Sequence, residues 1–209
     1  MSTSKRPDAT KPPRARRLLL CATGGYQCHT LPGFVLSLVR HFADDVQVVL
    51  SRAAARMVSK AAVEVASRHQ VFVEMDDTGP DVFVPHIELG RNVDLVLVYP
   101  ATVNVVGKVA NGIADELIPA LILATTAPVI FVPVANASMW SHPAARRNLK
   151  TLRDDGYAVL PPLPGVEVAT REGLDEMEGP FPLPTLLARM ASALSGSAGI
   201  GVPRREDDD

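Results

Sequence analysis

The sequence predicts an α/β protein: a single-domain, Rossmann-like (flavodoxin-like), doubly wound parallel sheet. Short β-branched runs alternate with helical segments along the chain, and no internal repeat interrupts the alternation. In addition, the strand-like runs at 94–99 and 128–132 each end at a proline, which is followed by a loop containing asparagine. Open parallel sheets bind ligands just beyond the carboxyl ends of their strands, so these two loops are the first candidates for a site.

The first half of the chain contains three predicted strands and two predicted helices. The run 17–22, which is apolar from Leu18 to Ala22, predicts a buried strand. A helix follows from Pro32, which suits a first helical turn, to about His41. The β-branched run 46–50 predicts the second strand and the Ala-rich segment 53–67 the second helix. A short strand at 71–73 precedes a loop at 76–85, which contains the Gly79-Pro80 turn signal.

The second half continues the alternation, and right-handed crossovers are expected between its parallel strands. The predicted elements are a strand at 95–99, a helix at 105–124, a strand at 128–132, a helix at 143–154, a strand at 157–160 and a helix at 183–194. Ser141 is predicted to cap the helix that has Pro143 in its first turn. The chain therefore divides into a basic, Pro-rich tail (1–16), one domain (17–194) and an acidic tail (195–209), and both tails have the composition of disordered segments.

Composition and charge argue against several classes of protein. A net charge of -2 and a pI near 6.2 do not suit a nucleic-acid surface. Cys21 and Cys28 form neither a disulfide framework nor a metal pattern, so no metal is expected. The most apolar stretch, 118–137, is interrupted by three prolines, and the N-terminus lacks the apolar core of a signal peptide. We expect a cytoplasmic protein that binds neither nucleic acid nor membrane.

Two segments near the predicted strand ends have the chemistry of a phosphate site. Thr23-Gly24-Gly25 follows the first strand, and free backbone N–H groups in such a loop attract anions. Only two adjacent glycines are present, whereas the dinucleotide signature has three spaced ones, so a plain tight turn explains the segment equally well. Ser51, at the end of the second strand, is a second candidate contact for a phosphate or a ribityl chain.

Polar side chains beyond the strands are the candidates for catalysis and substrate binding. His86 follows Pro85 at a predicted helix start, with Arg91 just over one turn later, although a lone histidine is more often structural. Asn104 and Asn136 each follow a strand end, where asparagine also serves to cap helices. The charged groups Glu88, Asp115 and Glu116 are interpreted as solvated helix faces, and Met139-Trp140 as a core or subunit-interface plug.

Four segments together resemble the homo-oligomeric flavin-containing cysteine decarboxylases. They are His86-Ile-Glu-Leu, Pro100-Ala-Thr-Val-Asn-Val, Lys108-Val-Ala-Asn-Gly-Ile-Ala-Asp and Pro133-Val-Ala-Asn-Ala-Ser-Met-Trp. The likeness covers roughly residues 17–161 with order and spacing kept. One branch of the family decarboxylates phosphopantothenoylcysteine for coenzyme A. The other decarboxylates the C-terminal cysteine of a ribosomally made precursor peptide, as in lanthipeptide maturation.

The resemblance implies a flavin cofactor and a role for each candidate residue. Flavin provides the electron sink that a cysteine carboxylate otherwise lacks. FMN is the family's usual flavin, and FAD stays open. His86 is implied to accept the thiol proton and Asn104 to hold the carboxylate. Substrate contacts are implied for Asn136, Arg91, Met139 and Trp140. Flavin contacts are implied for Thr23, Gly24, Gly25, Ser51, Pro100, Ala101, Thr102, Val103, Asn104, Val105 and Val134. The family forms homotrimers, often within dodecamers, with the flavin at a subunit interface.

Departures from the family pattern bear on the substrate. Thr102, Val103 and Val105 replace Ser, Ala and Thr of the first motif, and Ala135 replaces Met of the second. The coenzyme A branch has a late Cys that reduces the enethiol intermediate, and Ala169 occupies its place here. The sequence therefore favours a peptidyl-cysteine decarboxylase whose product stays an aminoenethiol for aminovinyl-cysteine ring formation. The alternatives are a phosphopantothenoylcysteine decarboxylase and a non-catalytic flavin-binding regulatory subunit.

Overall fold

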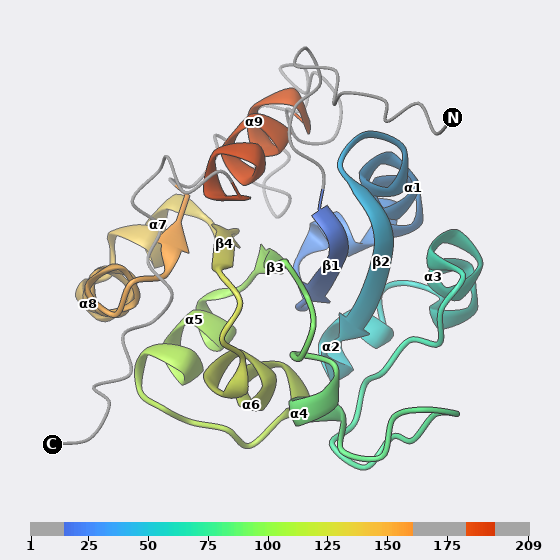
Figure 1. Ribbon diagram of the computed structural model, residues 1–209. Coiled ribbons are helices and arrows are strands. Elements are labelled where there is room, and N and C mark those ends of the chain that lie inside the picture. Colours follow the sequence, from blue (N-terminus) through green and yellow to red (C-terminus); the bar gives the residue numbers. More distant parts are fainter. Residues whose placement is uncertain (1–14, 161–182, 195–209) are drawn as a thin grey trace, which may run out of the picture.

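The computed structural model describes residues 15–160 and 183–194, and these contain one parallel sheet of five strands (Figure 1). The strands are β1 (Ala15–Ala22), β2 (Ala43–Leu50), β3 (Leu95–Ala101), β4 (Val129–Pro133) and β5 (Ala158–Val159). All pairings are parallel and the order is β2-β1-β3-β4-β5. This is the flavodoxin-like order, with the direction of winding reversing between β1 and β3, so the predicted fold class is confirmed.

Helices cover both faces of the sheet, and each face has its own hydrophobic core. One face carries α1 (Leu31–His41), α3 (Lys60–Ser67) and α9 (Leu183–Leu194), and the other carries α5 (Val103–Ala110), α6 (Leu117–Ala124) and α8 (Pro143–Asp154). Figure 1 shows α1 and α9 above the sheet and α5 and α6 below it. Successive strand residues alternate between the cores, since Leu20 belongs to the first and Cys21 to the second.

The single helix predicted at 53–67 is wrong, because the segment forms two helices. The first is α2 (Arg52–Ala55) and the second is α3. Each begins with its own serine cap: the Ser51 hydroxyl accepts the Ala54 N–H at 3.1 Å, and the Ser59 hydroxyl accepts the Ala62 N–H at 3.3 Å. A serine in extended conformation satisfies the first free amides of a new helix, so it interrupts the one before.

The single helix predicted at 105–124 is also wrong, and here the break is an Asn-Gly turn. The first helix, α5, ends at Ala110, and Gly112 has φ +67°, a left-handed conformation that favours glycine. The Ile113 N–H then donates to the Lys108 carbonyl at 2.8 Å, which completes a typical helix ending. The next helix, α6, begins at Leu117.

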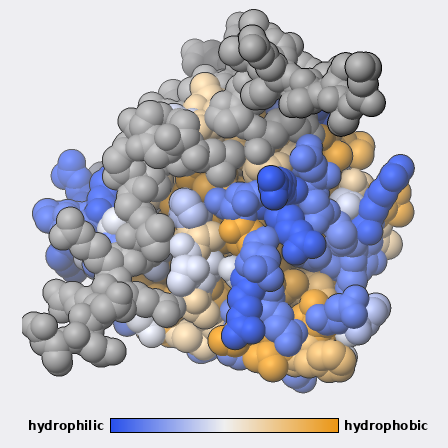
Figure 2. Space-filling model, in the orientation of Figure 1, coloured by the Kyte–Doolittle hydropathy of each residue, from blue (hydrophilic) through white to orange (hydrophobic). Residues whose placement is uncertain are grey.

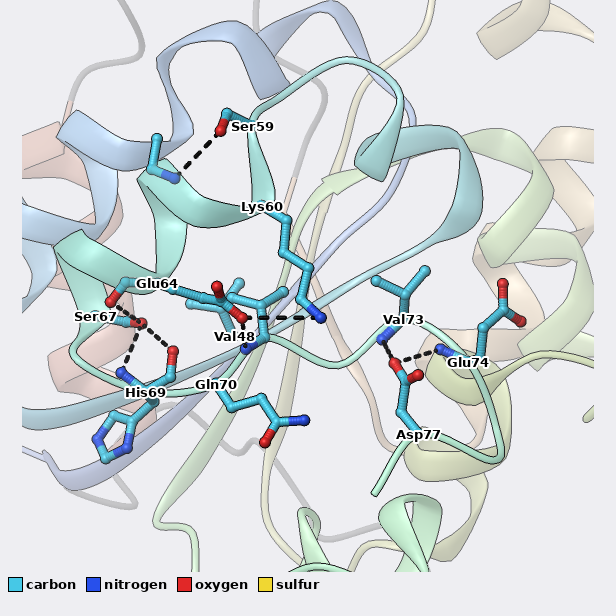
Figure 3. A network of polar contacts seen from close by, with 12 residues as sticks. Val48, Ser59, Lys60, Glu64, Ser67, His69, Gln70, Val73, Glu74 and Asp77 are labelled. Carbon is cyan, nitrogen blue, oxygen red and sulfur yellow. Dashed lines mark hydrogen bonds and ion pairs between the residues drawn. The ribbon is translucent and has the colours of Figure 1, made fainter. Parts of the chain in front are cut away.

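The strand predicted at 71–73 is reduced to an isolated bridge between Val49 and Phe72. The neighbouring backbone N–H groups donate to a side chain and not to an adjacent strand. The Asp77 carboxylate accepts the N–H groups of Val73 at 2.7 Å and Glu74 at 3.0 Å (Figure 3). A two-sided ladder needs those amides, so pairing with the edge strand β2 stops after one bridge.

Smaller differences concern element ends. The first strand begins two residues before its predicted start, since the Asp94 carboxylate accepts the N–H groups of Arg16 at 2.6 Å and Arg17 at 2.9 Å. Ser141 does not cap α8, because its hydroxyl donates to the Ser138 carbonyl. The cap is His142, whose Nδ1 accepts the Ala144 N–H at 3.2 Å.

The helix start predicted at Pro85-His86 is that of α4 (Pro85–Glu88), and two further short helices were not predicted: η1 (Tyr26–Thr30) and α7 (Ala137–Ser141). Residues 1–14 and 195–209 and Ala169 lie outside the described residues, so both tails and that substitution stay predictions from sequence. No helix in the described part of the chain has the length and apolar content to cross a bilayer. Nor do residues 15–160 and 183–194 gather three or more His, Cys, Asp or Glu side chains as a metal site.

Candidate active site

A hollow of about 210 Å³ lies at the carboxyl ends of β1, β2 and β3. The strand order makes this the crevice in which a doubly wound sheet binds its ligand. Six predicted site residues line it: Thr23, Gly24, Ser51, Thr102, Asn104 and Val105. Four further residues line it that were not predicted as site residues: Ala53, Glu116, Ile118 and Pro119. Three of these, Glu116, Ile118 and Pro119, lie at the start of α6. The single helix predicted at 105–124 had placed them in mid-helix.

The Thr23-Gly24-Gly25 turn fits between two neighbouring elements and has no room for side chains at its glycines. A Cβ on Gly24 would lie 2.5 Å from the Cβ of Ala53, on α2. A Cβ on Gly25 would lie 2.9 Å from Val134 Cγ2 and 3.0 Å from Pro100 Cβ. The turn therefore depends on glycine for close packing, and this packing brings the ends of β1, β3 and β4 together.

Hydroxyl groups join the ends of β1 and β3 directly. The buried Thr23 hydroxyl donates to the Pro100 carbonyl at 2.7 Å and accepts the Thr102 N–H at 2.9 Å. The hydroxyl oxygens of Thr23 and Thr102 lie 3.0 Å apart. These bonds fix the start of α5 against the first loop, so the wall of the hollow that carries Asn104 is held by backbone and side chain together.

Two helices begin at the hollow without side-chain caps. The N-cap residue of α5 is Thr102 and that of α6 is Glu116, and neither side chain bonds to the first amides of its helix. Those amides and the positive end of each helix dipole favour ligand groups that carry negative charge or lone pairs. The hollow therefore presents donors from backbone amides beside the side chains of Ser51 and Asn104.

Lys108 holds the loop between α5 and α6. Its ammonium lies 2.9 Å from a carboxylate oxygen of Asp115 and 2.9 Å from one of Glu116. Burial lowers the pKa of Lys108, but the bonds to both carboxylates outweigh it and leave the pKa above its ordinary value. Hydrogen bonding to Lys108 lowers the pKa of Asp115. The interpretation of Glu116 as a solvated helix face is wrong, because Glu116 lines the hollow and pairs with Lys108.

His86 lies at the start of α4, as predicted, but it does not line the hollow. Its Nδ1 is buried and has no hydrogen-bond partner within the described chain. The helix start is held by Glu88, whose carboxylate accepts the N–H groups of Phe83 at 2.6 Å and Val84 at 3.1 Å. These backbone bonds lower the pKa of Glu88. Glu88 was interpreted as part of a solvated face, and the structure corrects this to a capping role.

Asn136 and Trp140 lie on the loop and helix that follow β4. The Asn136 side-chain oxygen accepts the Met139 N–H at 2.8 Å, so Asn136 caps α7, the alternative that the sequence left open. The Trp140 ring packs against the second core, and its Nε1 is buried without a partner in the described residues. Along with Asn136 and Trp140, the predicted site residues outside the lining of the hollow are Gly25, His86, Arg91, Pro100, Ala101, Val103, Val134 and Met139.

Ala101 is a fully buried member of the second core, so no part of it is open to the hollow in this structure.

Residues 7–185 match the sequence profile of the Flavoprotein family. The chain belongs to the Flavoprotein family. This family membership agrees with the described α/β fold, a single parallel sheet covered by helices on both faces.

This flavoprotein is similar in sequence to curated proteins of coenzyme A biosynthesis. The coenzyme A biosynthesis bifunctional protein CoaBC of Bacillus subtilis (strain 168) is 37% identical over 166 residues, which are 79% of this chain and 40% of that protein. This chain spans about two fifths of the length of the curated relatives it matches.

Two solved structures have the same fold. MrsD from Bacillus sp. HIL-Y85/54728 superposes with a TM-score of 0.71 and 27% identity, over 86% of this chain and 96% of that one. The FMN-dependent cysteine decarboxylase SpaF superposes with a TM-score of 0.65 and 28% identity, over 77% of this chain and 95% of that one.

Proposed function

We propose that this flavoprotein is an enzyme that decarboxylates a cysteine carboxylate with the help of a bound flavin. The observation that carries the proposal is the hollow at the β1–β3 switch point, where Asn104 stands beside Thr102 and Ser51 in a chain of the Flavoprotein family. The SpaF likeness supports the chemistry, because that protein is an FMN-dependent cysteine decarboxylase.

The residues around the hollow fit a flavin. Ser51 and the amides near Gly24 suit a phosphate or a ribityl chain, while Thr102, Asn104 and the uncapped start of α5 suit a polar ring edge. We propose FMN, and FAD is the alternative that extraction of the flavin would identify. Bound flavin supplies the two-electron oxidation of the cysteine Cβ–S bond that makes loss of carbon dioxide possible.

The chain's own residues then have three tasks. His86 takes the thiol proton of the substrate, since an imidazole nitrogen is the commonest general base in proteins. Asn104 binds the substrate carboxylate through its amide and leaves it ionised for departure as carbon dioxide. Asn136, Arg91, Met139 and Trp140 contact the rest of the substrate. Capping of α7 by Asn136 fixes the position of Met139 and Trp140 on that helix.

Phosphopantothenoylcysteine is the substrate that the sequence relatives favour. CoaBC of Bacillus subtilis is 37% identical over most of this chain, and other CoaBC proteins are among its relatives. Decarboxylation by this enzyme would then yield the saturated thiol of the coenzyme A route, provided that the two electrons removed in the oxidation are returned to the enethiol.

A peptide with a C-terminal cysteine is the second candidate, and cysteine chemistry favours it. Ala169 occupies the place of the reducing Cys, and the chain's only thiols are Cys21 and Cys28. Both thiols are buried, and burial raises the pKa of Cys28 to about 11 and that of Cys21 further. Neither supplies a thiolate at neutral pH, so the product should stay at the aminoenethiol stage.

Mass spectrometry of products distinguishes the two substrates. Purified flavin-loaded protein is mixed in separate reactions with phosphopantothenoylcysteine and with a cysteine-ending peptide. Loss of carbon dioxide and two hydrogens from the peptide supports the peptide enzyme, and turnover of phosphopantothenoylcysteine alone supports the coenzyme A enzyme. The His86→Asn variant should bind flavin and reduce none of it with either substrate. A wild-type protein that binds flavin but reduces it with neither would be a regulatory subunit.

We further propose that copies of this chain assemble into homotrimers, and these into a dodecamer. A hollow of about 210 Å³ is small for a flavin, because ligand pockets usually measure roughly 300–1,000 Å³. His86 Nδ1 and Trp140 Nε1 are buried without partners in the described chain. Phe83, Val84 and Leu123 are exposed apolar residues around α4 and α6, and Figure 2 shows hydrophobic surface along the lower edge, where these helices lie in Figure 1. Sedimentation velocity tests the assembly.

A further inference from the structure

The hydroxyl of Thr23 has only one direction available for its hydrogen. Its oxygen lies 2.7 Å from the carbonyl oxygen of Pro100. A carbonyl oxygen carries no hydrogen, so this bond uses the single hydroxyl hydrogen of Thr23. Toward every other neighbour, the Thr23 hydroxyl can act only as an acceptor.

Thr102 supplies both remaining bonds. Its backbone N–H donates to Thr23 Oγ1 at 2.9 Å, and its hydroxyl oxygen lies 3.0 Å from the same atom. Because Thr23 has no second hydrogen, the Thr102 hydroxyl is the donor in this second bond. Both lone pairs of the Thr23 oxygen are then used. The only hydrogen of the Thr102 hydroxyl is engaged in this bond, and the lone pairs of its oxygen remain available.

Those lone pairs are not used by the helix that Thr102 begins, since its side chain makes no capping bond to α5. Thr102 lines the hollow. We propose that Thr102 is an acceptor-only group of the flavin site and that Thr23 is the positioning residue that sets this polarity. The proposal rests on the proposed function, because it takes the ligand of the hollow to be a flavin.

An acceptor-only hydroxyl selects ligand groups that donate a hydrogen. On a flavin these are the ribityl hydroxyls and the ring N–H groups, whereas a ring carbonyl or an unprotonated ring nitrogen would meet lone pair against lone pair. Thr23 therefore acts on the flavin through Thr102. Its own hydroxyl, although it borders the hollow, has no capacity left for a ligand.

The test is a titration of flavin-free protein with FMN, followed by fluorescence, for a double-mutant cycle. We expect Thr102→Val to weaken FMN binding roughly fivefold to tenfold, the worth of about one hydrogen bond. Thr23→Val frees the Thr102 hydrogen to turn into the hollow and should weaken binding comparably. In the Thr102→Val background, Thr23→Val should add less than about a twofold loss. Thr102→Ser and Thr23→Ser keep the hydroxyls and should bind within about twofold of wild type.

Further measurements keep the outcome clear. Thr23→Val leaves the Thr102 N–H without its acceptor, so circular dichroism must show that this variant folds. If it does not fold, the test is the difference in FMN affinity between Thr102→Val and Thr102→Ser. The midpoint potential of the bound flavin should shift in Thr102→Val if the donor is a ring N–H and stay constant if it is a ribityl hydroxyl. Wild-type protein that takes up no flavin would overturn the proposed function and this inference together. Wild-type protein that binds FMN no better than Thr102→Val, or losses from the two Val variants that simply add, would overturn the inference alone.

Discussion

The Lys108 ammonium lies 2.9 Å from the Glu116 carboxylate, and this contact ties the last turn of α5 to the first residue of the wall that α6 contributes to the hollow. The same ammonium also holds Asp115. Glu116 shares the hollow with Ser51 and Gly24, the residues that we expect beside the flavin phosphate. Lys108 thus neutralises negative charge at the place where we propose that the flavin phosphate binds.

Lys108→Met should weaken FMN binding roughly tenfold at low salt, equivalent to about 1.4 kcal/mol, because two carboxylates are left without their cation near the phosphate. The difference should shrink as ionic strength rises, since salt screens the repulsion. Fluorescence titration at two salt concentrations measures it. Lys150→Met, which breaks an exposed Lys150–Asp154 pair on α8, is the matched control and should bind like wild type. Equal affinities in all three proteins would contradict the role given to Lys108.

Gly24→Ala should destabilise the protein by roughly 1–3 kcal/mol, the usual cost of forcing an extra methyl group into a packed position. The added Cβ would lie 2.5 Å from that of Ala53, so the loop or α2 must move. Urea unfolding of both proteins measures the change. Gly33→Ala is the control, because Gly33 is an exposed residue of α1 and a Cβ there meets nothing within 4 Å. This variant should leave stability unchanged or raise it by up to about 1 kcal/mol. A neutral Gly24→Ala would show that the loop has room.

Asn104→Asp should weaken substrate binding by roughly 1–4 kcal/mol, because it sets a negative charge against the substrate carboxylate at the few ångströms expected. Asn104 is exposed at the hollow, so the variant should fold normally. Calorimetric titration of flavin-loaded His86→Asn protein, with and without Asn104→Asp, measures binding without turnover. Asn92→Asp makes the same charge change in an exposed loop and should leave affinity intact. If both aspartate variants bind substrate equally well, Asn104 does not hold the carboxylate.

The start of α4 should loosen in acid. The backbone bonds from Val84 and Phe83 lower the folded-state pKa of Glu88, so their stabilisation is complete above the unfolded pKa of about 4.3. It is lost as the pH falls through the lower folded-state pKa. Hydrogen exchange at the Phe83 and Val84 amides should accelerate below that range beyond the change of the intrinsic rate. Glu88→Gln should abolish this acid-dependent step, whereas Asp81→Asn in the preceding loop should keep it.

The sequence by itself determined the architecture, because strand and helix periods are local properties of the chain. Apolar runs such as 18–22 and 95–99 have no polar face, which suits strands covered on both sides by helices. Prolines that end strands, and Pro85 before His86, marked the boundaries at which loops meet the ligand side. Six of the residues predicted around the cofactor line one hollow for this reason.

The breaks within the helices predicted at 53–67 and 105–124 were missed because the signals that cause them are only one or two residues long. Ser59 and the Asn111-Gly112 turn each end an otherwise helical pattern, and a single cap or left-handed residue outweighs the propensity of the segment around it. Because no break was predicted before α6, Glu116, Ile118 and Pro119 were not recognised as lining residues.

Only the tertiary structure decided how the polar groups pair. Residues as distant in sequence as Thr23 and Thr102 share hydrogen bonds because β1 and β3 are neighbours in the sheet, and no local pattern records which strands lie side by side. The same holds for Glu88 and Glu116, which as charged residues were expected on solvated helix faces. Glu88 instead accepts backbone N–H groups at the start of α4, and Glu116 pairs with Lys108 and lines the hollow. A charged or hydroxyl side chain takes its role from the donors and acceptors that folding brings within about 3 Å, and that distance is set by the packing of the whole domain.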